Sequence, residues 1–214
     1  GVTKDVIPML FTETIVIGGR GVVCNNLFER GAELYTSYDL YIGSSHAENA
    51  LKKYKQYIEN SDIEIADSYE YTVYTAESTV MTDYVASVDS EYIRHYDQDT
   101  VMRASDYAAL RSMLGFPAVE PADGGYIIHC MEYLAEPMKA YDQPLTIGDA
   151  TLTPSGVYTE DFTQYLWCGN GSGFILVVPD DAALSCTPVN DLLGIMLDAP
   201  MDSTHYWALR DIHI

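Results

Sequence analysis

Residues 101–130, VMRASDYAALRSMLGFPAVEPADGGYIIHC, decide more of the fold than any other stretch of this sequence. Ser105 suits the N-cap of a helix, because its hydroxyl can accept a hydrogen bond from a backbone N–H that the first turn leaves unpaired. Gly115 suits the left-handed position that ends a helix, and Pro117 prevents the helix from continuing. The apolar residues at both ends of the stretch predict strands. We therefore expect a strand, a short helix, a loop and a second strand.

A second helix is predicted at residues 45–60. Ser45 and Glu48 have the spacing of a capping box, in which each side chain bonds the backbone N–H of the other. Apolar residues then recur at helical spacing along one face. Three lysines in the middle of this segment, Lys52, Lys53 and Lys55, are expected to form a solvated face.

Further strands are predicted from alternating or continuous apolar residues bounded by turn residues. They are expected at residues 12–17, 22–24, 63–73, 145–152, 174–178 and 194–197. Residues 145–152 should form a hairpin that turns at Gly148 and Asp149. A further helix should run on from Thr204, and residues 79–88 fit either structure. This order predicts an α+β fold for residues 1–214, with a mixed sheet and helices packed mainly on one face, in one domain or two small lobes.

The charge balance excludes one class of function. The chain has 214 residues, with 11 Lys and Arg against 32 Asp and Glu, for a formal net charge of −21. A surface this acidic repels phosphate backbones, so nucleic acid is not expected as a partner. It also disfavours electrostatic docking on anionic lipid. The acidic residues are expected mainly to form a solvated exterior.

The four cysteines do not have the spacing of a metal site or a dithiol redox site, since no Cys-x-x-Cys occurs. Cys130 lies in an apolar segment and is expected to be a buried thiol. Cys168 and Cys186 flank the strand predicted at 174–178 and could form a disulfide in an oxidising compartment. Free thiols are the simpler expectation.

Other candidate motifs are better explained by structure than by chemistry. His129 and Cys130 are neighbours on a strand and should point to opposite faces, so they cannot readily form a thiol–base pair. The glycine-rich residues 169–173 precede a strand and have no following Lys, unlike a phosphate-binding loop. Asp180 should begin a helix, while Asp97 and Asp99 should lie on a solvated turn. We therefore predict no catalytic, cofactor-binding or metal-binding residue, and no cofactor.

Two separate segments resemble one family of membrane proteins. The first joins Ser105-Asp106-Tyr107, a helix ending in Leu-Gly, and the strand Tyr-Ile-Ile-His-Cys at 126–130. The second is GFILVVPD at residues 173–180. Both are similar to the extracytoplasmic regions of FtsX-like (MacB-like) ABC transporter permeases of Gram-positive gut bacteria. Residues 1–96 resemble no family in this way.

The resemblance implies a non-catalytic extracellular domain of an ABC transporter permease at the cell membrane. Its partners would be transmembrane segments of the same chain, a cytoplasmic ATPase subunit, and a peptide or lipid substrate. The domain would couple ATP-driven motion to substrate or partner binding outside the membrane. The sequence contains no signal peptide and no apolar run long enough to span a bilayer, and both ends look cut, as expected for an excised domain.

Two alternatives remain open at this stage. A secreted hydrolase would need a pocket that joins Cys130 or an acid pair to one of the other histidines. A secreted carbohydrate- or peptide-binding module could use the faces formed by the 18 tyrosines.

Overall fold

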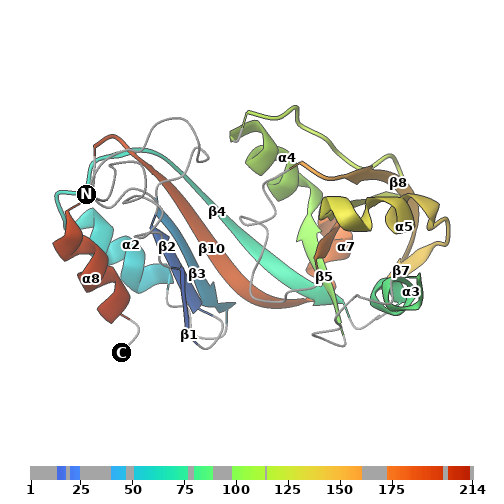
Figure 1. Cartoon of the computed structure of the whole chain (residues 1–214), viewed down its shortest axis with the longest axis horizontal. Coiled ribbons are helices and arrows are strands. Elements are labelled where there is room, and N and C mark those ends of the chain that lie inside the picture. Colours follow the sequence, from blue (N-terminus) through green and yellow to red (C-terminus); the bar gives the residue numbers. More distant parts are fainter. Residues whose placement is uncertain are drawn as a thin grey trace, which may run out of the picture. The chain divides into compact units, whose positions relative to one another are not determined.

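The computed structural model describes residues 14–17, 20–24, 40–46, 51–76, 80–88, 98–113, 115–160, 173–199 and 202–212. The chain divides into two compact units (Figure 1). Unit 1 combines Gly1–Tyr71 with Asn190–Ile214, and unit 2 is the continuous segment Thr72–Val189. Two long strands, β4 (Ile65–Ala76) and β10 (Thr187–Leu197), contribute residues to both units.

The described residues of unit 1 form a sheet and two helices. Its strands follow the order β1-β2-β3-β10-β4, and the pairs β1–β2, β2–β3 and β3–β10 are antiparallel. The other elements described in this unit are β1 (Thr14–Ile17), β2 (Arg20–Cys24), β3 (Leu40–Ser45), α2 (Leu51–Glu59) and α8 (Ser203–Asp211).

The core of unit 1 lies between its sheet and α2. Leu51, Tyr54 and Ile58 are buried at helical spacing along one face of α2. They share a hydrophobic cluster with Ile195 of β10 and Leu209 of α8, so both helices pack on that sheet. The opposite face of α2 is left to solvent.

The predicted start of the helix at residues 45–60 was wrong in part. Ser45 is the last residue of β3, and α2 runs from Leu51 to Glu59. Glu48, the other half of the predicted capping box, lies outside the described residues. Ser45 instead pairs with Asn190 in the antiparallel ladder between β3 and β10.

Unit 2 has a mixed sheet, which confirms the predicted α+β class. Its strands follow the order β4-β5-β9-β6-β8-β7, with β5–β9 and β6–β8 parallel and β4–β5, β6–β9 and β7–β8 antiparallel. The other elements that the structure describes in this unit are α3 (Val80–Val88), β5 (Asp99–Arg103), α4 (Ala104–Met113), β6 (Gly125–Cys130), the 3-10 turn η2 (Glu132–Leu134), α5 (Ala135–Ala140), β7 (Leu145–Ile147), β8 (Ala150–Tyr158), β9 (Phe174–Val178) and α7 (Asp180–Leu184).

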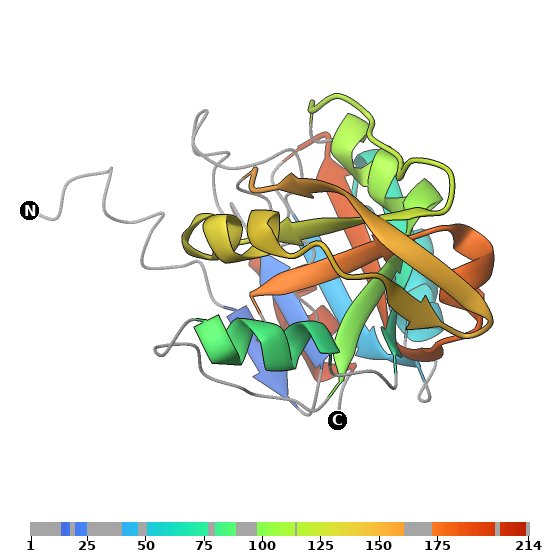
Figure 2. The same ribbon diagram turned by 90° about the vertical axis from the view of Figure 1, so that its right-hand side faces the viewer.

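The two faces of the unit 2 sheet are covered differently (Figure 2). Cys130 of β6 and Phe174 of β9 share a cluster with side chains of α3, α5 and α7, including Met81 and Met138. Alternate residues on these strands face the other way, where α4 packs. Helices therefore lie mainly on one face, with α4 alone among these four on the other.

The end of α4 forms as the sequence predicts, whereas its start does not. Gly115 takes a φ of +82°, and the N–H groups of Gly115 and Phe116 donate to the carbonyls of Ser112 (3.1 Å) and Arg111 (2.9 Å). This is the paired hydrogen bonding of a Schellman motif. At the other end, α4 begins at Ala104, so Ser105 lies inside the first turn.

Asp180 replaces the expected Ser105 cap. The backbone N–H of Ser105 donates to Oδ1 of Asp180 at 3.0 Å, and its hydroxyl donates to Oδ2 at 2.6 Å. Asp180 is also the first residue of α7, as predicted. The start of α4 is thus stabilised by a carboxylate from the first residue of α7.

The hairpin prediction is confirmed, and one turn prediction is wrong. Gly148, at a φ of +58°, and Asp149 connect β7 to β8, which continues well beyond the predicted strand.

Asp99 was expected on a solvated turn, but it lies in β5 with 1% of its surface exposed. There its carboxylate accepts from the N–H of Met81 at 3.4 Å, near the start of α3. Asp97 is outside the described residues.

Candidate functional site

The α4 side of the unit 2 sheet holds a cluster of four polar side chains, here called the α4 network. Tyr107 and Arg111 lie one turn apart on α4, His129 comes from β6, and Glu160 follows β8. Arg111 is 1% exposed and His129 is fully buried. Charged and polar groups at this depth need hydrogen-bond partners to offset their lost hydration.

The guanidinium of Arg111 organises the α4 network. Its Nη1 donates to Oε2 of Glu160 at 2.9 Å and its Nη2 to Oε1 at 2.6 Å, which is a bidentate pair. Nη1 also donates to the hydroxyl oxygen of Tyr107 at 3.2 Å. Since Arg can only donate, the hydroxyl proton of Tyr107 is available for Nδ1 of His129, 2.8 Å away.

Burial sets the protonation of this network. Desolvation lowers the pKa of His129 to about 4, so its imidazole is neutral at neutral pH. Desolvation also raises the pKa of Tyr107. The hydrogen bonds between Arg111 and Glu160 raise the pKa of the guanidinium and lower that of the carboxyl. The network therefore holds one cation and one anion that neutralise each other.

Aromatic rings enclose the same guanidinium. Its central carbon lies 4.9 Å from the ring centroid of Tyr158 and 5.7 Å from that of Phe116. Such contacts add cation–π stabilisation to the ion pair. The α4 network thus connects Glu160, which follows β8, to α4. The imidazole of His129 is buried and is therefore poorly placed to contact a substrate.

Cys130 points away from His129, as predicted. It is fully buried in the cluster on the opposite face of the sheet, and desolvation raises the pKa of its thiol to about 12. A thiol in such a setting stays protonated and is a poor nucleophile. Cys186 is a half-buried free thiol, and Cys168 lies outside the described residues.

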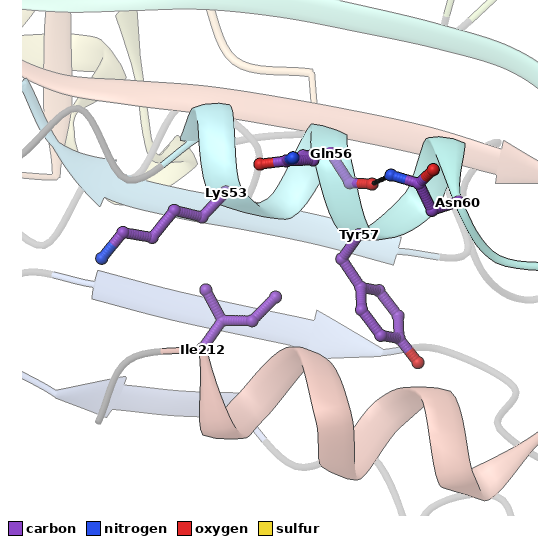
Figure 3. A pocket seen from close by; sticks show the side chains of 5 residues that line it. All are labelled: Lys53, Gln56, Tyr57, Asn60 and Ile212. Atoms are coloured by element: carbon purple, nitrogen blue, oxygen red, sulfur yellow. Dashed lines mark hydrogen bonds between the residues drawn. The ribbon is translucent and has the colours of Figure 1, made fainter.

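Unit 1 has an open groove on the solvent side of α2 (Figure 3). Its volume is about 420 Å³, and it is lined by Lys53, Gln56, Tyr57, Asn60 and Ile212. The first four residues come from α2 or its end, and Ile212 follows α8. We call this the α2–α8 groove.

A second Tyr–His pair lies at one wall of the α2–α8 groove. The hydroxyl of Tyr57 lies 2.8 Å from Nδ1 of His205, and Nε2 of His205 lies 2.7 Å from Oδ1 of Asp62. A carboxylate only accepts, so Nε2 of His205 donates to Asp62, and Nδ1 is the ring nitrogen that meets the hydroxyl of Tyr57. Burial, and then the charge of Asp62, raise the pKa of Tyr57. Tyr57 therefore stays a phenol and links α2 to α8.

The sequence motifs set aside as structural do not come together in one site. Of the glycine-rich residues 169–173, only Gly173 is described, at a φ of +73°. Lys55 forms an ion pair with Glu70 at 2.6 Å. Across the residues that the structure describes, no group of three or more His, Cys, Asp and Glu side chains could hold a metal ion. The same residues include no helix with the length and apolar character needed to cross a membrane.

Sequence reasoning missed both polar clusters. Tyr107 and Arg111 are four residues apart in the predicted helix, which was the one local signal available. Nothing in the sequence pairs Arg111 with Glu160, which is 49 positions away. Tyr57 and His205 are 148 positions apart.

Comparison with known proteins finds little similarity. No protein-family model matches the sequence, and no curated protein matches it significantly. A solved structure of a protein from Bacillus anthracis, provisionally named a lipoprotein, matches with a TM-score of 0.45 and 7% identity. The match covers 80% of this chain and 91% of that chain. Nothing about the activity of the present chain follows from this likeness.

Proposed function

We propose that this chain is a non-catalytic extracellular domain of an FtsX-like ABC transporter permease. In this role it lies on the outer side of the cell membrane, attached to transmembrane segments of its own chain. A cytoplasmic ATPase subunit drives the motion that the domain couples to a peptide or lipid substrate, or to a partner, outside the membrane.

The observation that carries this proposal is that the two resembling segments contact each other. Ser105, from the first segment, donates two hydrogen bonds to Asp180 of the second. The strands of the two segments also pair, with Ile128 opposite Leu176. The resemblance therefore falls on one contiguous part of unit 2 and not on two unrelated pieces of sequence. The contact between the two segments supports the proposal more strongly than two short sequence matches alone.

The chemistry of unit 2 favours a scaffold over a catalytic centre. The thiol of Cys130 is buried with a raised pKa, and His129 faces the other side of the sheet. Neither has the exposed, activated setting of a nucleophile and its base. These properties weaken the thiol-hydrolase alternative in particular.

The test is the gene and the complex that it encodes. The coding sequence on both sides of these residues should specify transmembrane segments, and the full-length protein should co-purify from membranes with an ATPase subunit. A complete gene without any membrane-spanning segment would rule out the permease. A complete permease that never associates with an ATPase would rule out the coupling role.

A further inference from the structure

The α2–α8 groove has the form of a recognition surface. It lies on the face of α2 opposite the buried residues Leu51, Tyr54 and Ile58, so occupying it would not disturb the core. Lys53, Gln56 and Asn60 are exposed along it, while Tyr57 and Ile212 are half-buried at its walls. The polar side chains repeat along the helix, so they suit a ligand whose own polar atoms are regularly spaced. The apolar walls suit its carbon groups.

The spacing of two amides in the groove matches an extended peptide. Gln56 and Asn60 are four residues apart, which places them about 6 Å apart along the helix axis. Alternate residues of an extended chain are separated by about 6.7 Å, so each amide can meet a backbone group of every second residue. The Nδ2 of Asn60 donates to the Gln56 carbonyl at 2.7 Å, and this fixes the orientation of the Asn60 amide (Figure 3).

The length of the groove limits the ligand to a short segment. From Lys53 to Asn60 the helix rises about 10 Å, which corresponds to about three extended residues. The ring of Tyr57 and the side chain of Ile212 offer apolar contact to side chains of that segment. A tripeptide therefore fits the run of polar and apolar groups.

Charge favours an acidic group at one end of this segment. The chain has 11 cations among 43 charged residues, yet Lys52, Lys53 and Lys55 lie within four positions of α2. Lys55 is engaged by Glu70, whereas the exposed Lys53 lines the groove. The charge of Asp62 acts on Tyr57 at one wall of the groove, so a ligand carboxylate is favoured at Lys53, one turn away along α2.

We propose that the α2–α8 groove binds a short extended peptide through its backbone, with a carboxylate of the peptide placed at Lys53. Gln56 and Asn60 meet alternate peptide groups, and Tyr57 and Ile212 contact the side chains. This names the class of substrate that the domain meets, and its physiological role rests on the proposed permease function. The binding itself needs only the chain described here.

The test uses NMR titration of the isotope-labelled chain with acetyl-trialanine carrying a free carboxylate, and with the same peptide as its C-terminal amide. Both should shift the amide signals of residues 53–60 and 212, with weak, measurable affinity. The free acid should bind about threefold to fivefold more tightly, as expected for one partly exposed ion pair. Lys53→Ala should abolish that preference, and Gln56→Ala should weaken both peptides about threefold.

Lys52→Ala is the matched control, because it removes the same charge from the same helix without altering the groove lining. It should leave the preference for the acid in place. If Lys52→Ala and Lys53→Ala reduce the preference for the free acid equally, that preference comes from the overall charge of the helix. This result would overturn the proposal. So would peptide shifts that avoid α2, or groove shifts produced by galacturonic acid but by neither peptide. Both variants alter exposed helix positions, and retained dispersion of the spectrum verifies that they are folded.

The outcomes separate this proposal from the permease proposal. If the peptide does not bind, a gene that encodes transmembrane segments still supports the permease proposal. Absence of such segments would remove the permease without changing a titration measured on this chain.

Discussion

Each unit contains a Tyr–His pair of nearly the same geometry in a different environment. In the α4 network, the Tyr107 hydroxyl lies 2.8 Å from Nδ1 of His129, with ring centroids 5.6 Å apart at 67°. Beside the α2–α8 groove, Tyr57 and His205 have the same 2.8 Å separation, with centroids 5.9 Å apart at 68°. The first histidine is fully buried, whereas the second is only half-buried.

The difference lies in the charged groups behind each pair. The buried pair is backed by Arg111, which needs Glu160 because its side chain is only 2% exposed. The outer pair is backed by Asp62, whose side chain is 91% exposed and already hydrated. Two pairs of nearly the same geometry therefore contribute unequally to stability, because water can replace the partners of the outer pair but not those of the buried pair.

Removing the carboxylate behind each pair should give the largest contrast. Glu160→Ala leaves the Arg111 charge buried without its main partner, and we expect a loss of about 3 to 5 kcal/mol in the free energy of unfolding. Asp62→Ala should cost less than about 1 kcal/mol, since that carboxylate is exposed. Urea denaturation of both variants gives the comparison.

Glu160→Gln is the companion variant in case the alanine variant does not fold. It keeps an acceptor for the guanidinium and loses only the charge, so its loss of stability should fall between those of the other two variants. Equal losses at positions 160 and 62 would contradict the view that burial sets the weight of each cluster.

The pH dependence of stability should report the burial of His129 in unit 2. The pKa of His129 is about 4 in the folded protein, against an ordinary 6.5. Between these values the unfolded chain binds a proton that the folded chain does not, so stability falls as the pH is lowered from about 6.5 to about 4. The full effect of this one group is about 3 kcal/mol.

His129→Gln removes this contribution and keeps an acceptor for the Tyr107 hydroxyl. Urea unfolding at several pH values between 4 and 7 should then show a shallower slope for the variant than for the parent chain. The acidic residues contribute equally to both, so the difference reports His129. Parallel curves would mean that His129 is not held neutral by burial.

The smallest contrast concerns the two hydroxyls. Tyr107→Phe removes a hydroxyl that accepts from Arg111 and donates to His129, and we expect a loss of about 1 to 3 kcal/mol. Tyr57→Phe should cost about 0.5 kcal/mol, because water can satisfy His205 at its half-buried site. Thermal and urea unfolding should agree, and a larger loss at Tyr57 would reverse the comparison.

The features that the sequence predicts well are those decided by adjacent residues. Gly115 and Gly148 both take positive φ values, and they end α4 and connect β7 to β8 as expected. The α+β class followed from the order of such local elements. Only short-range sterics and hydrogen bonds are needed for these features.

What the sequence could not predict depends on residues that meet only in the folded chain. Asp99 looked like a turn residue, yet it is buried where it can accept from the start of α3. Ser105 had the chemistry of a cap, but Asp180, 75 positions away, bonds to it instead. The α4 network needed the same kind of distant pairing between Arg111 and Glu160. Carboxylates are too numerous in this chain for any one to be selected as a partner in advance.

The division of the chain also has a consequence for how it folds. Unit 2 is one continuous segment, whereas unit 1 is assembled from two segments that flank it, with β10 pairing to β3 across the whole of that insertion. Closing so long a loop costs more entropy while the intervening chain is unfolded. We therefore expect unit 2 to fold early and the sheet of unit 1 to be completed last, when β10 joins strands made at the beginning of the chain.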